Sequence, residues 1–249
     1  MKISIITAIY NRDKTIARAL ESIKSQLHED VELVVIDGSS TDGSVRTIEG
    51  LIGTGDKFIS ETDKGIYDAL NKGIKYSTGE ILGFLHSDDL LAHNLVLSKV
   101  NDLFYANCAD IVYGDASFFA KNQENKVVRT YRSGPFSLKR LAWGWMPAHP
   151  AIFLRRSVFN LHGDFNTDYK IAADYAFLCR IAADLSLRVV YTPEVLVKMQ
   201  LGGVSTGGLR NTILLNREVL RACRENGIYS NILMLLSKYP MKALQFLLK

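Results

Sequence analysis

The stretch VELVVIDGSSTDGS, residues 31–44, decides the fold class of this chain. Its first six residues are apolar apart from Glu32, which is typical of a strand buried on both faces of a parallel sheet. The remainder is polar and contains two glycines, which indicates a loop at the carboxyl end of that strand. We therefore predict a strand over residues 31–36, followed by a polar loop that begins at Asp37.

The same alternation of strand, loop and helix extends to both sides of this stretch. The first 90 residues are predicted to contain further strands over 3–8, 57–60 and 81–85, and helices over 16–27 and 67–76. Such alternation predicts a parallel sheet with right-handed crossovers, whose ligands bind beyond the carboxyl ends of the strands. Both Asp-rich loops, after residues 36 and 85, fall at such ends.

The rest of the chain has a weaker pattern. Residues 110–132 are predicted to form two or three antiparallel strands, of which 127–132 is the clearest. The elements predicted after them are a helix over 171–185, a strand over 188–191, a helix after Gly208 and a helical tail over 229–249. The tail has no acidic residue, and its apolar residues alternate with lysines. We therefore predict one α/β domain over 1–228, followed by an amphipathic basic tail over 229–249.

Composition indicates a folded globular protein that suits anionic partners. Of its 249 residues, 47% are hydrophobic and 22% are charged, with a formal net charge of +4. Lys and Arg are scattered, so nucleic acid is not an expected partner. Three well-separated cysteines, no signal peptide and no membrane-spanning run predict a cytoplasmic protein. The basic, amphipathic composition of the tail predicts that it contacts the inner face of the cytoplasmic membrane. The alternative is that the tail packs on the domain or on a second subunit. The sequence leaves the oligomeric state open.

The Asp88-Asp89 pair follows a predicted buried strand. Neither GxGxxG nor GxxxxGK[ST] is present, which argues against a dinucleotide dehydrogenase and a P-loop ATPase. Two carboxylates at a strand end suit Mg²⁺ or Mn²⁺, with substrate phosphates and water completing the shell. The alternative is that the pair forms a turn and caps a helix that begins at Leu90.

Four motifs in order identify a family resemblance. They read TAIYNR over 7–12, VIDGSSTDGS over 35–44, DKGIYDALNKG over 63–73 and SDD over 87–89. In this order and spacing they resemble family 2 glycosyltransferases of the GT-A fold. The resemblance is strong over about 90 residues and continues more loosely through 148–150, 173–175 and 202–205. It is closest to bacterial enzymes of exopolysaccharide, O-antigen and colanic-acid assembly.

The resemblance implies a fold, an activity and a set of site residues. It implies a GT-A domain with a Rossmann-like nucleotide-binding half and a mixed, mostly parallel sheet. It also implies an inverting glycosyltransferase that moves a sugar from a nucleotide-diphosphate donor to a glycan acceptor, for example one linked to undecaprenyl. The implied residues are Thr7, Tyr10 and Asp37 for the nucleoside, Asp88 and Asp89 for metal and diphosphate with Asp89 as the expected direct ligand, and Asp174 as general base.

Each of these residues has an alternative structural interpretation. Asp37 either contacts the nucleotide or holds the turn towards Ser44. Asp174 is either the base or an exposed helical carboxylate, and this chain has Ala173 where many members have Glu. The other candidates are Lys72, for a phosphate or solvent; Trp145 and His149, for stacking on an acceptor sugar or for packing; and Ser205, for a loop that closes over the diphosphate or a plain turn.

Two other functions remain as alternatives. A sugar-nucleotide pyrophosphorylase normally carries a Gly-rich, Arg-containing loop after its first strand, whereas residues 7–12 contain no glycine. A non-catalytic module that binds sugar nucleotides would keep the same ligands. Donor hydrolysis or transfer in the presence of metal separates that module from an enzyme.

Overall fold

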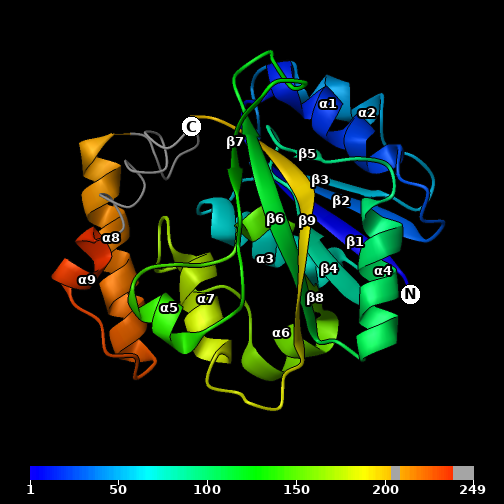
Figure 1. The fold of residues 1–249 in the computed structure, drawn as a ribbon. Helices are drawn as coiled ribbons and strands as arrows, with labels where there is room; N and C mark the ends of the chain where they lie inside the picture. The colour runs from blue at the N-terminus through cyan, green and yellow to red at the C-terminus, as the bar shows by residue number, and fades with distance from the viewer. Residues whose placement is uncertain (203–207, 238–249) are drawn as a thin grey trace.

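The computed structural model describes residues 1–202 and 208–237, which form one mixed sheet flanked by helices (Figure 1). The sheet order is β3-β2-β1-β4-β8-β6-β9-β5, and β7 pairs with β6. The strands are β1 Ile3–Ile9, β2 Val31–Asp37, β3 Lys57–Ser60, β4 Ile81–Phe84, β5 Leu90–Leu91, β6 Ile111–Phe119, β7 Val127–Tyr131, β8 Ile152–Arg155 and β9 Val189–Gln200. The predicted α/β fold class is confirmed.

Helices alternate with strands in the first part of the chain, and most of the remaining helices lie in its second half. They are α1 Asp13–Lys24, α2 Ser44–Glu49, α3 Ile66–Tyr76, α4 Val96–Asn107, α5 Leu138–Ala142, α6 Arg156–His162, α7 Ala173–Ile181, α8 Leu209–Glu225 and α9 Ile232–Leu236, with a short 3-10 turn, η1, at His149–Ala151. The elements predicted in the first 90 residues are all present, with ends that agree to within three residues.

Strand β1 lies between β2 and β4 and is parallel to both. All seven of its residues are buried. Because side chains alternate across a strand, Ile6 and Ala8 enter a core that contains α3, whereas Ile3, Ile5 and Ile9 enter a core that contains α1 and α4. The apolar run therefore reflects helices on both faces of the sheet.

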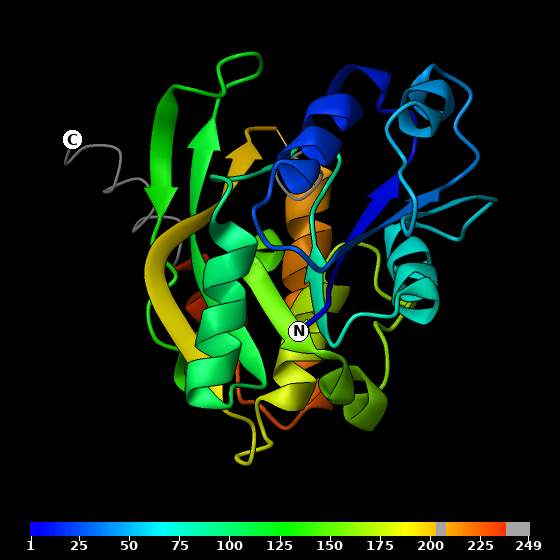
Figure 2. The same cartoon turned by 90° about the vertical axis from the view of Figure 1, so that its right-hand side faces the viewer.

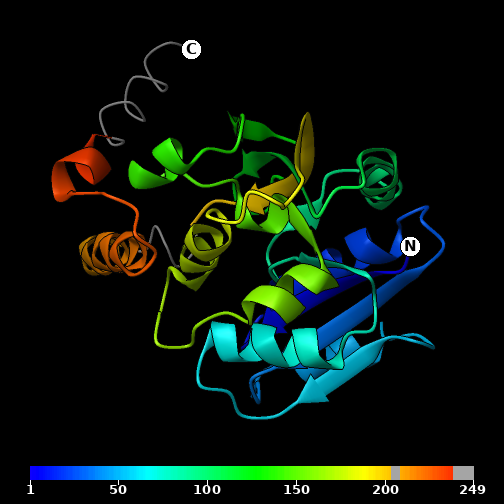
Figure 3. The same cartoon turned by 90° about the horizontal axis from the view of Figure 1, so that it is seen from below.

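The second half of the sheet is mostly antiparallel. Strand β8 is antiparallel to β4 and to β6, and β6 forms an antiparallel pair with β7, which confirms the predicted antiparallel additions. Strand β9 is parallel to β6 and curves past α4 (Figure 2). It continues to Gln200, far beyond the predicted end at residue 191. Helix α8 packs against α7 on the side away from the sheet (Figure 3).

Several elements differ from the prediction. The structure adds α2, α4, α5, α6 and β8, and it shortens the helix predicted over 171–185 to Ala173–Ile181. The alternative in which Asp89 caps a helix is wrong, because Leu90–Leu91 is the short strand β5, antiparallel to β9. The Asp88-Asp89 pair thus joins two strands of one sheet.

The predicted tail is described only in its first nine residues. Within them Leu235 of α9 is fully buried, and the Ser230 hydroxyl donates to the carbonyl of Ala142 at 2.6 Å. This part packs on the domain, whereas Lys238, Lys242 and Lys249 lie outside the described residues. No helix among residues 1–202 and 208–237 is long and apolar enough to cross a membrane.

Gly73 in the DKGIYDALNKG motif serves helix packing. A Cβ at this position would lie 2.3 Å from Cγ2 of Ile6, which is fully buried in β1. We expect Gly73→Ala to lower the free energy of unfolding by about 1–3 kcal/mol, the usual cost of overpacking. The matched control is Gly50→Ala, where the nearest atom to the new Cβ is at 3.6 Å, and a change within about 0.5 kcal/mol is expected. Urea unfolding measures both, and equal losses would contradict this role.

Candidate active site

Main-chain amides join the loops at the carboxyl ends of β1 and β2. The amide of Asn11 donates to Oγ of Ser40 at 2.8 Å, and the amide of Thr41 donates to Oδ1 of Asn11 at 2.8 Å. The amide of Arg12 donates to Oγ of Ser44 at 2.8 Å. The two loops predicted to hold the nucleoside therefore form one hydrogen-bonded unit.

Asp37 ends β2 and is fully buried. Its carboxylate accepts hydrogen bonds from the amide of Ser40 at 3.0 Å and from the hydroxyl of Ser60 at 2.6 Å. Asp37 therefore holds the turn after β2, which agrees with the alternative that it stabilises the turn towards Ser44. Its contact with the nucleoside stays a prediction.

The other two predicted nucleoside residues differ in accessibility. Thr7 is fully buried within β1, and its Oγ1 has no hydrogen-bond partner in the described part of the chain. Tyr10, just beyond the end of β1, has 58% of its surface exposed. Of the three predicted residues, Tyr10 is the one whose side chain can meet a ligand without rearrangement.

Asp63 comes from the loop between β3 and α3 and reaches the turn after β2. A Cβ on Gly38 would lie 2.5 Å from its Oδ2, so the glycine makes room for this carboxylate. Oδ1 of Asp63 accepts from the amide of Gly65 at 2.8 Å, where φ is +121°. Gly38 belongs to one motif, and Asp63 and Gly65 belong to another, so their proximity depends on the parallel pairing of β2 and β3.

Asp88 and Asp89 have different surroundings in the loop after β4. Asp89 is 3% exposed, and its Oδ1 accepts from the amide of Gln200 in β9 at 3.0 Å. Burial, together with the neighbouring charge of Asp88, raises the pKa of Asp89 well above its usual range. Asp88 is only partly buried. Asp89 thus anchors the loop to β9, and Asp88 is the more accessible carboxylate.

Asp174 lies in the first turn of α7, where a carboxylate interacts favourably with the helix dipole. Its Oδ1 accepts from the amide of Tyr175 at 2.8 Å and lies 3.2 Å from the hydroxyl of Tyr67 in α3. Burial raises the pKa of Asp174. A raised pKa makes it a stronger base than an exposed aspartate. The alternative of a freely exposed helical carboxylate does not fit these contacts.

His86 lies in the Asp88 loop and is influenced by the charge of Asp174 as well. Its ring experiences the charges of both carboxylates and lies 5.7 Å from the ring of His149. Burial, with His149 nearby, lowers the pKa of His86 to about 4, so the imidazole is neutral at pH 7. Its place directly before Ser87-Asp88-Asp89 was the available sequence signal.

His149 and Trp145 occupy different environments. His149 stacks on Phe84 of β4 with ring centroids 5.3 Å apart, and burial lowers its pKa to about 4. Trp145 lies under the guanidinium of Arg140, 3.8 Å from the ring centroid, so one face of its indole is covered. His149 therefore adjoins His86 in the site, and stacking of a sugar on Trp145 stays a prediction. Ser205 lies outside the described residues.

Lys72 forms ion pairs and a hydrogen bond with residues that are close to it in the sequence. Its Nζ lies 2.9 Å from Oε1 of Glu61 and 3.7 Å from Oδ2 of Asp68, and it donates to the carbonyl of Thr62 at 2.8 Å. The lysine ties α3 to the segment after β3. Its predicted phosphate contact would require these bonds to be exchanged.

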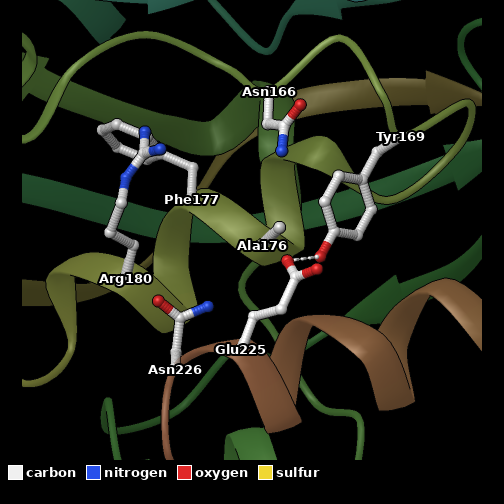
Figure 4. A pocket seen from close by; sticks show the side chains of 7 residues that line it. All are labelled: Asn166, Tyr169, Ala176, Phe177, Arg180, Glu225 and Asn226. Carbon is white, nitrogen blue, oxygen red and sulfur yellow. Dashed lines mark hydrogen bonds between the residues drawn. The ribbon is translucent and has the colours of Figure 1, made fainter.

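A small cavity of about 100 Å³ lies between α7 and the end of α8 (Figure 4). Its lining residues are Asn166, Tyr169, Ala176, Phe177, Arg180, Glu225 and Asn226. None of the predicted site residues is among them. The cavity belongs to the packing behind α7.

The sequence matches the family model "Glycosyl transferase family 2" over residues 4–162. The chain belongs to this family. A similar relative is the PGL/p-HBAD biosynthesis glycosyltransferase of Mycobacterium tuberculosis, 34% identical over 224 residues, which cover 88% of this chain and 82% of the relative. An uncharacterized glycosyltransferase of the same species is 32% identical over 183 residues, or 72% of this chain and 68% of that protein.

Solved structures of glycosyltransferases share the fold of this family 2 chain. The Staphylococcus aureus TarS fragment 1–349 in complex with UDP has a TM-score of 0.70 at 20% identity, covering 93% of this chain and 67% of that structure. The mannosyltransferase PcManGT from Pyrobaculum calidifontis, in complex with GDP-Man and Mn²⁺, has a TM-score of 0.62 at 18% identity, covering 98% and 80%. The GT-A fold is confirmed.

The raised pKa of Asp89 predicts a pH-dependent stability. In metal-free protein the folded state retains a proton that the unfolded state releases, so stability falls as pH rises from the usual carboxyl pKa to the raised one. In Asp89→Asn, Oδ1 still accepts from the Gln200 amide and nothing ionises. We expect this variant to gain stability relative to the native protein between about pH 4 and neutrality. Urea unfolding with a chelator measures this gain, and a pH-independent difference would contradict it.

Proposed function

We propose that this family 2 glycosyltransferase moves a sugar from a nucleotide-diphosphate donor to a glycan hydroxyl with inversion at the anomeric carbon. The observation that supports this most is the position of His86. Its ring experiences the charges of both Asp88, beyond β4, and Asp174, at the start of α7. A carboxylate suited to a metal-bound diphosphate and a carboxylate suited to proton abstraction therefore both influence the charge of one side chain.

The proposed reaction is a single displacement. The acceptor hydroxyl oxygen bonds to the anomeric carbon as the bond from that carbon to the diphosphate oxygen breaks, and the hydroxyl proton passes to Asp174. The leaving electron pair remains on the nucleoside diphosphate. Burial prepares Asp174 for this step by raising its pKa, while the Tyr67 hydroxyl holds the nearby main chain.

The donor set of the Asp88 loop fits a divalent cation that is shared with a substrate. The described residues contain no group of three or more His, Cys, Asp or Glu side chains that could hold a metal by themselves. Mg²⁺ and Mn²⁺ sites that use one or two carboxylates and substrate phosphates do not need such a group. Asp88 would be the direct ligand, with Asp89 fixing the loop, and the cation would neutralise the diphosphate.

The comparisons support the class of the donor. UDP is bound in the TarS structure and GDP-Man with Mn²⁺ in PcManGT. The mycobacterial relative is named for PGL/p-HBAD biosynthesis. For this chain we propose a glycan acceptor linked to a lipid such as undecaprenyl, at the inner face of the cytoplasmic membrane. Transfer confined to soluble acceptors without a lipid would contradict the lipid-linked part.

Removing the proposed base should separate binding from turnover. Asp174→Asn keeps the shape and an acceptor oxygen but cannot take the proton, so we expect kcat to fall by about 10²-fold or more. Donor affinity, measured by titration calorimetry, should stay within about twofold of the native value. Turnover comparable with the native protein would exclude Asp174 as the base. Native protein that binds a donor but neither hydrolyses nor transfers it would favour the non-catalytic module.

Removing the proposed metal ligand should affect binding first. Asp88→Ala deletes the accessible carboxylate, so we expect the Mn²⁺-dependent part of donor affinity to fall by about tenfold or more. The Mn²⁺-dependent part of the affinity is the difference between donor titrations in the presence of Mn²⁺ and in the presence of a chelator. Asp42→Ala is the matched control, since Asp42 is an exposed carboxylate in the loop after β2 that accepts from the amides of Asp13 and Ser44 and bonds the Ser44 side chain. If both variants retain the Mn²⁺ dependence, Asp88 does not bind the cation.

A further inference from the structure

Glu218 of α8 holds the main chain that leads into α7. Its Oε1 accepts from the amide of Lys170 at 2.8 Å, and its Oε2 accepts from the amides of Ile171 and Ala172, each at 2.9 Å. Glu218 is 7% exposed. One buried carboxylate therefore satisfies three successive amides, immediately before the helix that carries Asp174.

This arrangement has a clear electrostatic basis. Amides that precede the first turn of a helix have no partners within that helix, and the helix dipole favours a negative charge there. Hydrogen bonds from such amides to a carboxylate are stronger than bonds between neutral groups. The segment before α7 is thus fixed by α8, which lies beyond α7 from the sheet (Figure 3).

The fixed segment also determines where the Tyr67 proton points. The Tyr67 hydroxyl lies 2.6 Å from the carbonyl oxygen of Ile171 and 3.2 Å from Oδ1 of Asp174. The hydroxyl has one proton, and the shorter distance assigns it to Ile171. Asp174 then keeps a lone pair for a substrate proton. If the Ile171 carbonyl moved away, Tyr67 would donate to Asp174 instead and weaken it as a base.

We propose that Glu218 is a positioning residue for the reaction, which acts through residues 170–172 to keep the Asp174 carboxylate placed and free to accept a proton. This inference rests on the proposed role of Asp174 as base. Glu218 itself contacts the main chain and has no part in bond making. Its removal should therefore lower turnover while leaving the donor loops after β1, β2 and β4 unchanged.

The same helix supplies a matched control. Glu225 lies seven residues further along α8, where Oε2 accepts from the Tyr169 hydroxyl at 2.6 Å (Figure 4) and Oε1 pairs with Arg221 at 2.7 Å. It also joins α8 to the segment before α7, but through a side chain. Glu225→Gln removes a charge from the same helix without touching the amides of residues 170–172.

The first experiment compares Glu218→Gln with Glu225→Gln. Glutamine has nearly the size of glutamate, but its NH₂ group opposes at least one of the three amides. We expect Glu218→Gln to lower kcat by about 10- to 100-fold, the effect of misplacing a reacting group by about 1 Å. Donor dissociation constants, measured with UDP-sugar and Mn²⁺, should change less than about twofold in both variants. Native kcat in Glu218→Gln, or an equal fall in both, would overturn the proposal.

A double variant separates this proposal from the role of Asp174. If Glu218 acts through Asp174, adding Glu218→Gln to Asp174→Asn should slow the enzyme by less than about twofold further, because the interaction is already lost. The same 10- to 100-fold fall in both backgrounds would overturn the positioning role. If Asp174→Asn alone has native turnover, the proposed base is wrong, and that result is visible without the Glu218 variant.

Hydrogen exchange tests the geometry in the native protein, even if Glu218→Gln folds poorly. Amides bonded to a buried carboxylate should exchange slowly, so a peptide spanning residues 169–173 should be protected by at least about tenfold relative to the exposed loop at 121–125. Glu218→Asp, which retains the charge but is one methylene shorter, should lose most of this protection. Fast exchange in the native protein would overturn the proposal.

Discussion

The parallel pairing of β1 with β2 and β4 is the constraint on which the rest of the structure depends. It aligns the carboxyl ends of three strands at one edge, so the loops that begin at Tyr10, Gly38 and Leu85 become neighbours. Parallel strands need helical crossovers, which bury both faces of β1. The second half of the sheet continues from β4 through the antiparallel β8, whose preceding turn places His149 against Phe84. The site is therefore built around the end of β4.

Carboxylates serve two separate tasks in this chain. Three buried ones hold main chain: Asp37 accepts from Ser40, Asp89 from Gln200, and Glu218 from residues 170–172. The partly exposed ones, Asp63, Asp88 and Asp174, lie on the loops and helix start that these bonds fix. Because a buried carboxylate is costly unless it is well hydrogen-bonded, each amide contact both satisfies the carboxylate and restrains the chain. Asp88 and Asp174, the proposed metal ligand and base, are thereby placed by carboxylates that have no proposed part in bond making.

The sequence predicted the parallel half of the fold well because burial on both faces gives strands that are nearly continuous apolar runs. Strand β9 was predicted only to residue 191, since Pro193 and Glu194 interrupt its apolar pattern and several of its residues are only half-buried. In the candidate site, the motifs and the resemblance pointed to Asp88, Asp89 and Asp174, with Asp89 as the expected direct ligand. Tyr67 and His86 were missed because their meaning depends on distant partners: Tyr67 lies 107 positions from Asp174 along the chain. The division between Asp88 and Asp89 likewise depends on Gln200, 111 positions from Asp89.

The charge balance of the candidate site supports the proposed divalent cation. The charges of Asp88 and Asp174 act on His86, which is neutral at pH 7, as is His149, so these histidines do not offset the carboxylates. Among the cations described near these loops, Arg18 binds Glu124 and Gln200, and Lys72 binds Glu61 and Asp68. A diphosphate entering here would bring further negative charge into a partly desolvated site, where repulsion between like charges is stronger than in water. The divalent cation proposed above would remove this repulsion on entering with the donor.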